Sequence, residues 1–314
     1  MRHRRGRLVI FLLVLAALGI SPYARAQAQS PQTAARQITQ LIEQNQFPQA
    51  IDAANLAVAQ WPRDAQIHHL LGLAYFKNGD LAGAGEQLAE AVKLAPNQAD
   101  MHYDLALSEL AGKKYAEAAM QLEQSNRLDP SNALAHLLLG RAYLNTNRTL
   151  QAVGQFQQAL KIEPGIPLGH YHLGFVYETL GKNREAIAEF QKEVAADPNS
   201  AETLYQLGHT LLESGELAEA VATLQRCLAL EQRFDAQYDL GKAYLLERKL
   251  PESIETLKKA IELNPNDASA HYQLAHAFAA TGDKTSAEME LQQFRALQAA
   301  QHSEGGMASG RVIK

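Results

Sequence analysis

Residues 133–164 read ALAHLLLGRAYLNTNRTLQAVGQFQQALKIEP, and the rest of the chain repeats this stretch. Its clearest marker is the closing proline, Pro164. In steps of 34 residues, Pro130 and Pro96 precede it and Pro198 follows it. A fixed period of this length indicates a protein built from tandem structural repeats.

Each repeat predicts two helices. Within residues 133–164, two sets of residues recur at spacings of three and four, which places each set on one helix face. They are Leu139, Gly140 and Tyr143, followed by Ala152, Phe156 and Ala159. A turn signal lies between the two helices, because a glycine just past a helix adopts the left-handed conformation that ends it. The signals are Asn78-Gly79-Asp80, Leu180-Gly181-Lys182, Ser214-Gly215-Glu216, Thr281-Gly282-Asp283 and, at the matching place, Asn147.

The repeats cover almost the whole chain after its N-terminal segment. Within a solenoid over residues 27–301, the predicted units lie near 31–64, 65–98, 99–132, 133–166, 167–200, 201–233, 234–267 and 268–301. The first unit is a weak copy, as terminal repeats commonly are. Glu109 replaces the aromatic residue of the third unit, and the sixth unit lacks one residue and its proline. We expect local irregularity at these places.

The pattern L-G-x-x-Y … A-x-x-x-F-x-x-A … P at a 34-residue period resembles the tetratricopeptide repeat family. The resemblance implies an all-α protein, a right-handed α-solenoid of antiparallel helix pairs. It also implies that the first helices of the units line a concave groove that binds protein partners.

The first 26 residues resemble a cleavable signal peptide, with an arginine-rich start, an uncharged apolar run over residues 8–20 and Ala24-Arg25-Ala26 before the cleavage point. Cleavage after Ala28 would fit as well. A membrane anchor is the alternative, but a run of thirteen residues is shorter than the roughly 20 that span a bilayer. Arg4-Arg5 also fits a twin-arginine leader, although the apolar core favours the general secretory route. We therefore expect an exported, periplasmic or secreted protein, with a disordered tail over residues 302–314.

The charge of the chain argues against nucleic-acid binding. The formal charge is −5, and removal of residues 1–26, which hold five arginines and no acidic residue, makes it −10. Phosphate contacts need a basic stripe, and the sequence has none. The only cysteine, Cys227, excludes an intramolecular disulfide and stands where other repeats bury alanine, so we interpret it as a core thiol.

A ladder of histidines is the one candidate for chemistry. Adjacent rungs of stacked helices lie about 8–10 Å apart, too far for two imidazoles to share a zinc ion bound at about 2 Å. The resemblance implies a bulky aromatic at this position, so we interpret the histidines as flat packing residues. The sequence predicts no cofactor, no metal site and no enzyme. The histidine ladder consists of His68, His102, His136, His170 and His271.

The resemblance also places two rows of residues on the groove. The first row is His69, Tyr103, Leu137, Tyr171, Tyr205, Tyr238 and Tyr272. The second row is Leu73, Leu107, Arg141, Phe175, His209, Lys242 and His276. Two interpretations stay open: an aromatic trough that holds a peptide, or tyrosines that only pad the contacts between helices. The rows lack the lysine and asparagine of family members that clamp a terminal carboxylate, although Arg141, His209, Lys242 and His276 could meet an acidic ligand.

The predicted function is a non-enzymatic protein-interaction scaffold that binds a partner peptide in the groove. An assembly factor for the envelope, a pilus or a secretion system is the alternative within the binding class. A metal-binding protein or an accessory subunit of an enzyme is the alternative from another class. Self-association through the weakly capped ends also stays open.

Overall fold

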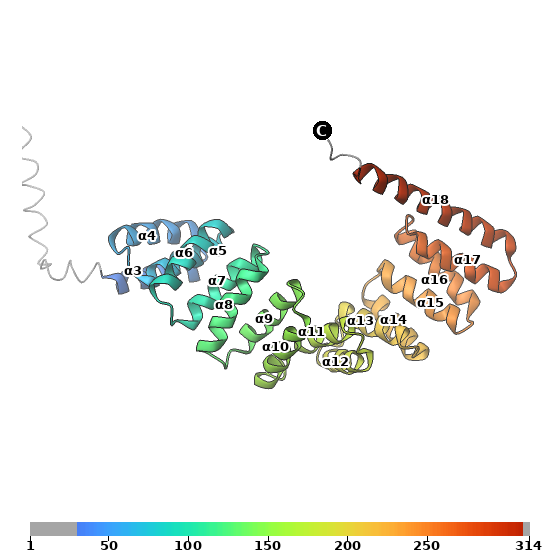
Figure 1. Ribbon diagram of the computed structural model, residues 1–314, viewed down its shortest axis with the longest axis horizontal. Coiled ribbons are helices and arrows are strands. Elements are labelled where there is room, and N and C mark those ends of the chain that lie inside the picture. The colour runs from blue at the N-terminus through green and yellow to red at the C-terminus, as the bar shows by residue number, and fades with distance from the viewer. Residues whose placement is uncertain (1–29, 310–314) are drawn as a thin grey trace, which may run out of the picture. The chain divides into compact units, whose positions relative to one another are not determined.

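The computed structural model describes residues 30–309, with side chains to residue 300 (Figure 1). These residues form helices and no strand, as an all-α solenoid requires. The predicted signal peptide, residues 1–26, lies outside the described residues. No helix in the described range is both long and apolar enough to cross a membrane.

The chain divides into two compact units at residues 148 and 149, and each unit is a stack of consecutively packed helices. The helices of unit 1 are α3 (Pro31–Glu43), α4 (Phe47–Gln60), α5 (Ala65–Lys77), α6 (Leu81–Leu94), α7 (Ala99–Ala111), α8 (Tyr115–Leu128) and α9 (Ala133–Asn145). The helices of unit 2 are α10 (Thr149–Ile162), α11 (Gly169–Thr179), α12 (Asn183–Ala196), α13 (Ala201–Glu213), α14 (Leu217–Leu230), α15 (Phe234–Leu246), α16 (Leu250–Leu263), α17 (Ala268–Thr281) and α18 (Lys284–Ser309).

The repeated Leu-Gly pair explains the close contact within each helix pair. A Cβ atom on Gly208 of α13 would lie 2.7 Å from Cγ of Leu224 in α14, closer than real Cβ contacts allow. The residue sixteen positions after the glycine therefore fills the space that the missing side chain leaves. The same relationship joins Gly72 to Leu88, Gly174 to Phe190 and Gly241 to Leu257.

The turns within the pairs take the left-handed conformation that the sequence predicts. Gly79, Gly181, Gly215 and Gly282 have φ between 69° and 86°, and Asn147 has φ of 58°. Lys113 and Arg248 adopt the same conformation without being glycine, at φ of 58° and 63°. The helix pair is thus closed in the same way even where the sequence offers no turn signal.

Unit 2 is irregular where the missing proline predicts it and at a second place. Residues 231–233 join α14 to α15 without the turn that the other connections between pairs contain, and Arg233 gives α15 no side-chain cap. The start of α11 is irregular as well, because the helix begins only at Gly169 and Leu168 before it has φ of 62°. The buried carboxylate of Glu193 accepts the backbone N–H groups of Leu168 and Tyr171, each at 3.1 Å. A side chain from α12 therefore supplies the cap that α11 lacks.

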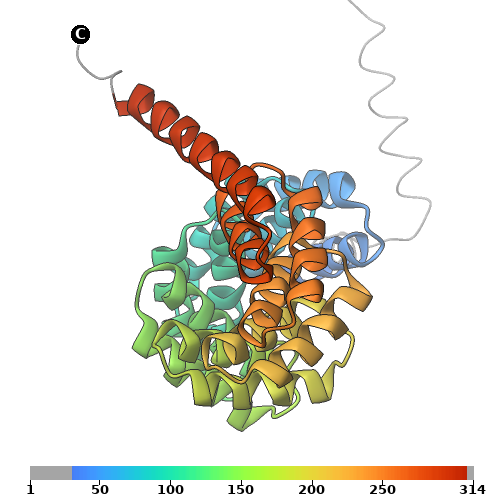
Figure 2. The same ribbon diagram turned by 90° about the vertical axis from the view of Figure 1, so that its right-hand side faces the viewer.

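The last helix is longer than the repeat pattern predicts. It begins at Lys284 and continues to Ser309, whereas the sequence predicts disorder from His302. Figure 2 shows it as one helix whose C-terminal part extends beyond α17. Residues 302–309 carry no proline, which allows the helix to continue. Residues 310–314 lie outside the described range.

Candidate protein-interaction surface

Within each unit, the first helices of neighbouring pairs contact one another. In unit 1, α5 contacts α3 and α7; in unit 2, α13 contacts α11 and α15, and α15 contacts α17. No comparable contact joins successive second helices in the described part of either unit. The stack is therefore tighter on the side of the first helices. We call this side the inner face and the side of the second helices the outer face.

The first row divides into buried and accessible members. His69 and Leu137 are buried, and Nε2 of His69 lies 2.7 Å from Oδ2 of Asp104 in α7, so both residues join helices of the stack. Tyr272 is the most accessible member, with 39% of its surface exposed. The half-buried members are Tyr103, Tyr171, Tyr205 and Tyr238.

The tyrosines of unit 2 also pack against other rings. The Tyr171 ring lies 6.0 Å from Phe190 of α12, and the Tyr272 ring lies 5.1 Å from Phe294 of α18. Tyr238 stacks on Phe234 within α15. Each ring therefore packs against another ring with part of its surface, and part of the remaining surface is accessible to solvent. Whether the accessible part meets a ligand stays a prediction.

The second row is the more accessible of the two. Phe175 exposes 38% of its surface, although a phenylalanine gains more by burial than most side chains. Arg141 and His276 are exposed, and the ring of His276 lies 4.5 Å from that of Tyr272. The half-buried members are Leu73, Leu107, His209 and Lys242.

Two cations of the second row are already paired. Nζ of Lys242 lies 2.8 Å from Glu213 Oε1, and Nδ1 of His209 lies 2.8 Å from Oδ2 of the buried Asp239. The hydrogen bond to Asp239 raises the pKa of His209 above its ordinary value. The hydrogen bond from Lys242 lowers the pKa of Glu213. An acidic ligand would have to displace these carboxylates, which weakens the hypothesis that Lys242 and His209 bind one.

Sequence reasoning missed the most elaborate contact on the inner face. Arg233 binds both carboxylate oxygens of Asp235, at 2.6 and 2.7 Å, and donates to Glu202 Oε2 at 2.7 Å. Its guanidinium carbon lies 4.5 Å from the centroid of the Tyr205 ring. The position of Arg233 in the repeat could have indicated this contact. Arg233 directly precedes α15, whereas Ser200 and Asp267 at the same place before α13 and α17 are side-chain caps.

The phenol groups of the inner face stay neutral. Burial is the main cause that raises the pKa of Tyr171 to about 12, with a further contribution from the Glu202 carboxylate. Burial and the nearby Asp239 raise the pKa of Tyr205 as well. These rings therefore offer uncharged hydroxyl groups and π faces beside carboxylates.

The histidine ladder is hydrogen-bonded as well as packed. In four rungs, Nε2 lies 3.0 to 3.3 Å from the carbonyl oxygen of the proline six residues earlier. In four rungs, Nδ1 lies 2.6 to 2.8 Å from a side-chain oxygen nineteen residues later, in the second helix. Each such histidine ties the preceding loop or the second helix to the first helix. Within residues 30–309, no three histidine, cysteine or acidic side chains gather closely enough to hold a metal ion.

Glu109 is an unusual carboxylate in unit 1. It stands in α7 where other first helices have Tyr143 or Tyr244, whose hydroxyls bond to the preceding second helix. Its Oε2 is buried without a hydrogen-bond partner. Burial, and secondarily the charge of Glu117, raises the pKa of Glu109 to about 7.

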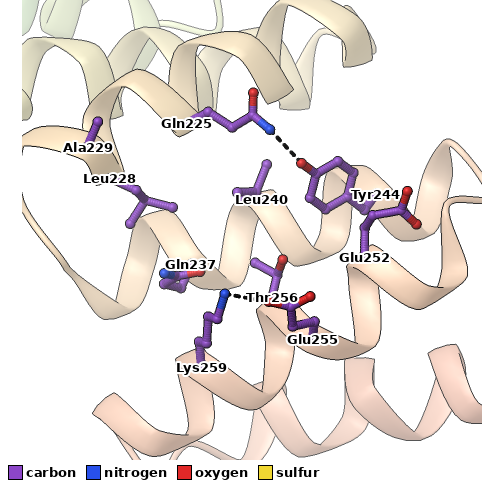
Figure 3. A pocket seen from close by; sticks show the side chains of 10 residues that line it. All are labelled: Gln225, Leu228, Ala229, Gln237, Leu240, Tyr244, Glu252, Glu255, Thr256 and Lys259. Atoms are coloured by element: carbon purple, nitrogen blue, oxygen red, sulfur yellow. Dashed lines mark hydrogen bonds and ion pairs between the residues drawn. The ribbon is translucent and has the colours of Figure 1, made fainter.

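A pocket of about 350 Å³ opens on the outer face of unit 2 (Figure 3). Its floor is Leu240 and Tyr244 of α15, and Tyr244 accepts a hydrogen bond from Gln225 of α14. Glu255 and Lys259 of α16 line one wall and pair with each other at 2.6 Å. None of the residues that line this pocket belongs to either row.

Cys227 is fully buried, and its thiol lies 3.3 Å from the carbonyl oxygen of Ala201. Burial raises the pKa of Cys227 to about 11, which keeps the thiol protonated. The interpretation of Cys227 as a core thiol is confirmed.

Comparison with known families agrees with this arrangement. A tetratricopeptide repeat profile matches residues 35–99, 86–133, 103–167 and 137–201, and a second one matches 177–245. A TPR repeat profile matches residues 248–282. The chain belongs to the tetratricopeptide repeat family. No curated protein sequence matches it.

Solved structures of other tetratricopeptide proteins show the same fold. MamA is 25% identical with a TM-score of 0.51 and covers 52% of this chain and 97% of its own. PilW, described as a type IV pilus biogenesis factor, is 25% identical with a TM-score of 0.54 and covers 63% and 92%. YrrB, described as having an unusual peptide-binding site, is 24% identical with a TM-score of 0.55 and covers 60% and 97%.

The two units of this chain differ in the residues of the two rows. Tetratricopeptide proteins are generally non-catalytic interaction modules, and the two rows stay the predicted binding residues of this chain. Here the row members of unit 1 include the buried His69 and Leu137, whereas unit 2 has the two exposed aromatic rings of the rows, Phe175 and Tyr272. Unit 2 is therefore the better candidate surface.

Proposed function

We propose that this protein is a non-catalytic scaffold that binds a partner peptide along the inner face of unit 2. The observation that carries the proposal is the exposure of Phe175 and Tyr272 beside a row of half-buried tyrosines. Aromatic side chains that are partly buried and rigidly held are typical of the residues that dominate binding energy at protein interfaces.

The fixed packing of the row supports a surface that is ready before the partner arrives. Tyr171 and Tyr272 are each held by a ring from the neighbouring second helix. A partner then orders few side chains of the scaffold on binding, which lowers the entropic cost of association. The peptide-binding description of YrrB belongs to another protein of the same fold and is consistent with this use.

The test is the capture of a partner from an extract of the native cell by the mature protein. We expect Phe175→Ser/Tyr272→Ser to lose the captured partner while remaining helical. Leu230→Ser/Leu263→Ser is the matched control, because these residues of second helices expose 47% and 48% of their surfaces. Capture that survives in the first variant but fails in the control would move the site to the outer face.

A second candidate function is assembly of an envelope structure or a pilus, which we propose from two observations. The sequence begins with an arginine-rich, apolar segment that resembles a signal peptide, and PilW is a similar structure. Export would place the scaffold where such structures form. Fractionation of cells that produce the tagged full-length chain tests it, and retention of uncleaved protein in the cytoplasm would contradict it.

A further inference from the structure

The inner face of unit 2 carries more negative than positive charge. Among the described residues, the helices α11, α13 and α15 hold five carboxylates, whereas these helices and the residues directly before them hold two full cations, Arg233 and Lys242. The first helices of unit 1 are nearly balanced, with four carboxylates and three cations over α3, α5, α7 and α9. The five carboxylates of unit 2 are Glu178, Glu202, Glu213, Asp235 and Asp239.

These carboxylates lie on the inner face, because they bridge neighbouring first helices. Glu178 of α11 accepts a hydrogen bond from the Thr210 hydroxyl of α13 at 2.7 Å. The contacts of Glu213 with Lys242 and of Asp239 with His209 likewise join α13 to α15. Glu202 and Glu213 are paired with Arg233 and Lys242, but they keep 50% and 48% of their side chains exposed, so a further cation can reach these carboxylates.

Arg233 shows which side chain this surface accepts. Its guanidinium lies over the Tyr205 ring and between the carboxylates of Glu202 and Asp235, with three hydrogen bonds of 2.6 to 2.7 Å. A planar cation gains both from the π face and from the paired carboxylates. The chain itself thus provides an example of an arginine bound to the inner face.

Neighbouring first helices repeat the tyrosine without the arginine. The residue before α13, which corresponds to Arg233 for the Tyr171 ring, is Ser200, and the residue before α17, which corresponds for the Tyr238 ring, is Asp267. The Tyr171 hydroxyl nevertheless lies 3.4 Å from Glu202. A ring and a carboxylate are therefore in place at Tyr171, and in the described part of the chain no cation lies over the Tyr171 or Tyr238 ring as Arg233 lies over Tyr205.

We propose that the inner face of unit 2 selects a peptide segment rich in arginine or lysine, with one cation over Tyr171 beside Glu202 and another over Tyr238. This inference rests on the proposed function and adds the chemistry of the partner. Adjacent first helices are about 10 Å apart, so about six extended residues span the distance from α11 to α15, and a peptide with a cation at every third residue can place one at Tyr171 and one at Tyr238.

The test uses three fluorescein-labelled peptides of equal length and equal leucine content. Every third residue is Arg in one peptide, Gln in the second and Glu in the third. Fluorescence anisotropy with the mature chain should show the Arg peptide binding about tenfold more tightly than the Gln peptide, with the Glu peptide weakest. The preference should shrink as salt concentration rises.

Two variants with the same change of charge show whether the preference for the Arg peptide depends on carboxylates of the inner face or of the outer face. Glu178→Gln/Glu213→Gln on the inner face should reduce the preference for the Arg peptide to about twofold. Glu252→Gln/Glu255→Gln at the outer pocket should leave it unchanged. Tyr171→Leu/Tyr238→Leu, which keeps apolar surface, should reduce the preference while the Gln peptide still binds.

Equal binding of the peptides, preference for the Glu peptide, binding of none, or equal loss in both charge variants would overturn the proposal. A dimer in light scattering at these concentrations, with no peptide bound, would assign the face to a second copy and also overturn it. If Phe175→Ser/Tyr272→Ser still abolishes capture of a cellular partner in these cases, the scaffold function stands and only its preference for cations fails.

Discussion

The guanidinium carbon of Arg233 lies 4.5 Å from the centroid of the Tyr205 ring, and no other first helix in the described range is preceded by an arginine. The position before the helix usually supplies a side-chain cap, as Ser200 does for α13. At α15, Asp235 accepts the backbone N–H of Ala236 instead, at 2.8 Å. Arg233 is thereby free to connect α15 with Glu202 of α13 on the inner face.

Replacement of this arginine should weaken unit 2. Arg233→Gln leaves Glu202 and Asp235 close together without their shared cation, and we expect a loss of about 1 kcal/mol in the free energy of unfolding. Urea unfolding followed by circular dichroism measures it, and the loss should shrink at high salt. Lys259→Gln breaks an exposed pair in α16 and should cost less than about 0.5 kcal/mol. Equal costs would show that the Arg233 contacts add no stability of their own.

The Leu-Gly pair should tolerate no side chain at the glycine. Gly208→Ala places a Cβ 2.7 Å from Cγ of the fully buried Leu224, and we expect a cost of about 1–3 kcal/mol. Gly154→Ala in α10 meets no atom within 4 Å and should stabilise the helix by about 0.5–1 kcal/mol. Urea midpoints that move in the same direction for both variants would refute the packing argument.

Glu109 should make unit 1 less stable at high pH. Its pKa in the folded protein is raised from an ordinary value of 4.5 to about 7, so folding favours the protonated form. This contribution is complete below pH 4.5 and is lost as the pH rises through 7. Glu109→Gln should therefore be more stable than the native protein by about 1–3 kcal/mol at pH 8, and the difference should vanish near pH 4.5.

Urea unfolding at a series of pH values measures this difference. Glu86→Gln removes an exposed carboxylate from the adjacent α6 and serves as the control for the change of net charge. A difference between Glu109→Gln and the native protein that does not vary with pH would contradict the account of Glu109.

The histidines of the ladder should stabilise the fold through their hydrogen bonds as well as through the packing of their rings. His102→Phe keeps a ring but loses the contacts of Nδ1 with Gln121 at 2.7 Å and of Nε2 with the Pro96 carbonyl at 3.0 Å. We expect a cost of about 1–2 kcal/mol. His276→Phe replaces an exposed histidine and should change stability by less than about 0.5 kcal/mol. Native stability of His102→Phe would restore the interpretation of packing alone.

The sequence predicts the helix pairs well because their determinants are local and repeated. Leu139, Tyr143 and Phe156 recur at the spacing of a helix face, and all three are buried. The left-handed turn at Asn147 follows from the same alignment of repeats. The same residue pattern recurs in every repeat, so a departure from the pattern in one repeat does not change the fold.

The polar contacts could not be predicted in the same way. Lys242 meets Glu213, and Arg233 meets Glu202, across 29 and 31 residues of sequence. Such pairs depend on the rotamers of long side chains and on which residues of adjacent first helices lie opposite one another. The repeat pattern predicts neither. The histidine ladder was placed at the correct positions, but its partners in the preceding loop and the second helix were missed for the same reason.

Site-specific photo-cross-linking tests the central claim most directly. A photoreactive phenylalanine analogue is placed at Phe175 or Tyr272 on the inner face, and at Leu230 or Leu263 in second helices as controls, in the full-length chain in its native cell. The account predicts adducts to a partner protein from positions 175 and 272 and none from the controls. Adducts from positions 230 or 263 alone, or the same adducts from all four positions, would contradict binding on the inner face of unit 2.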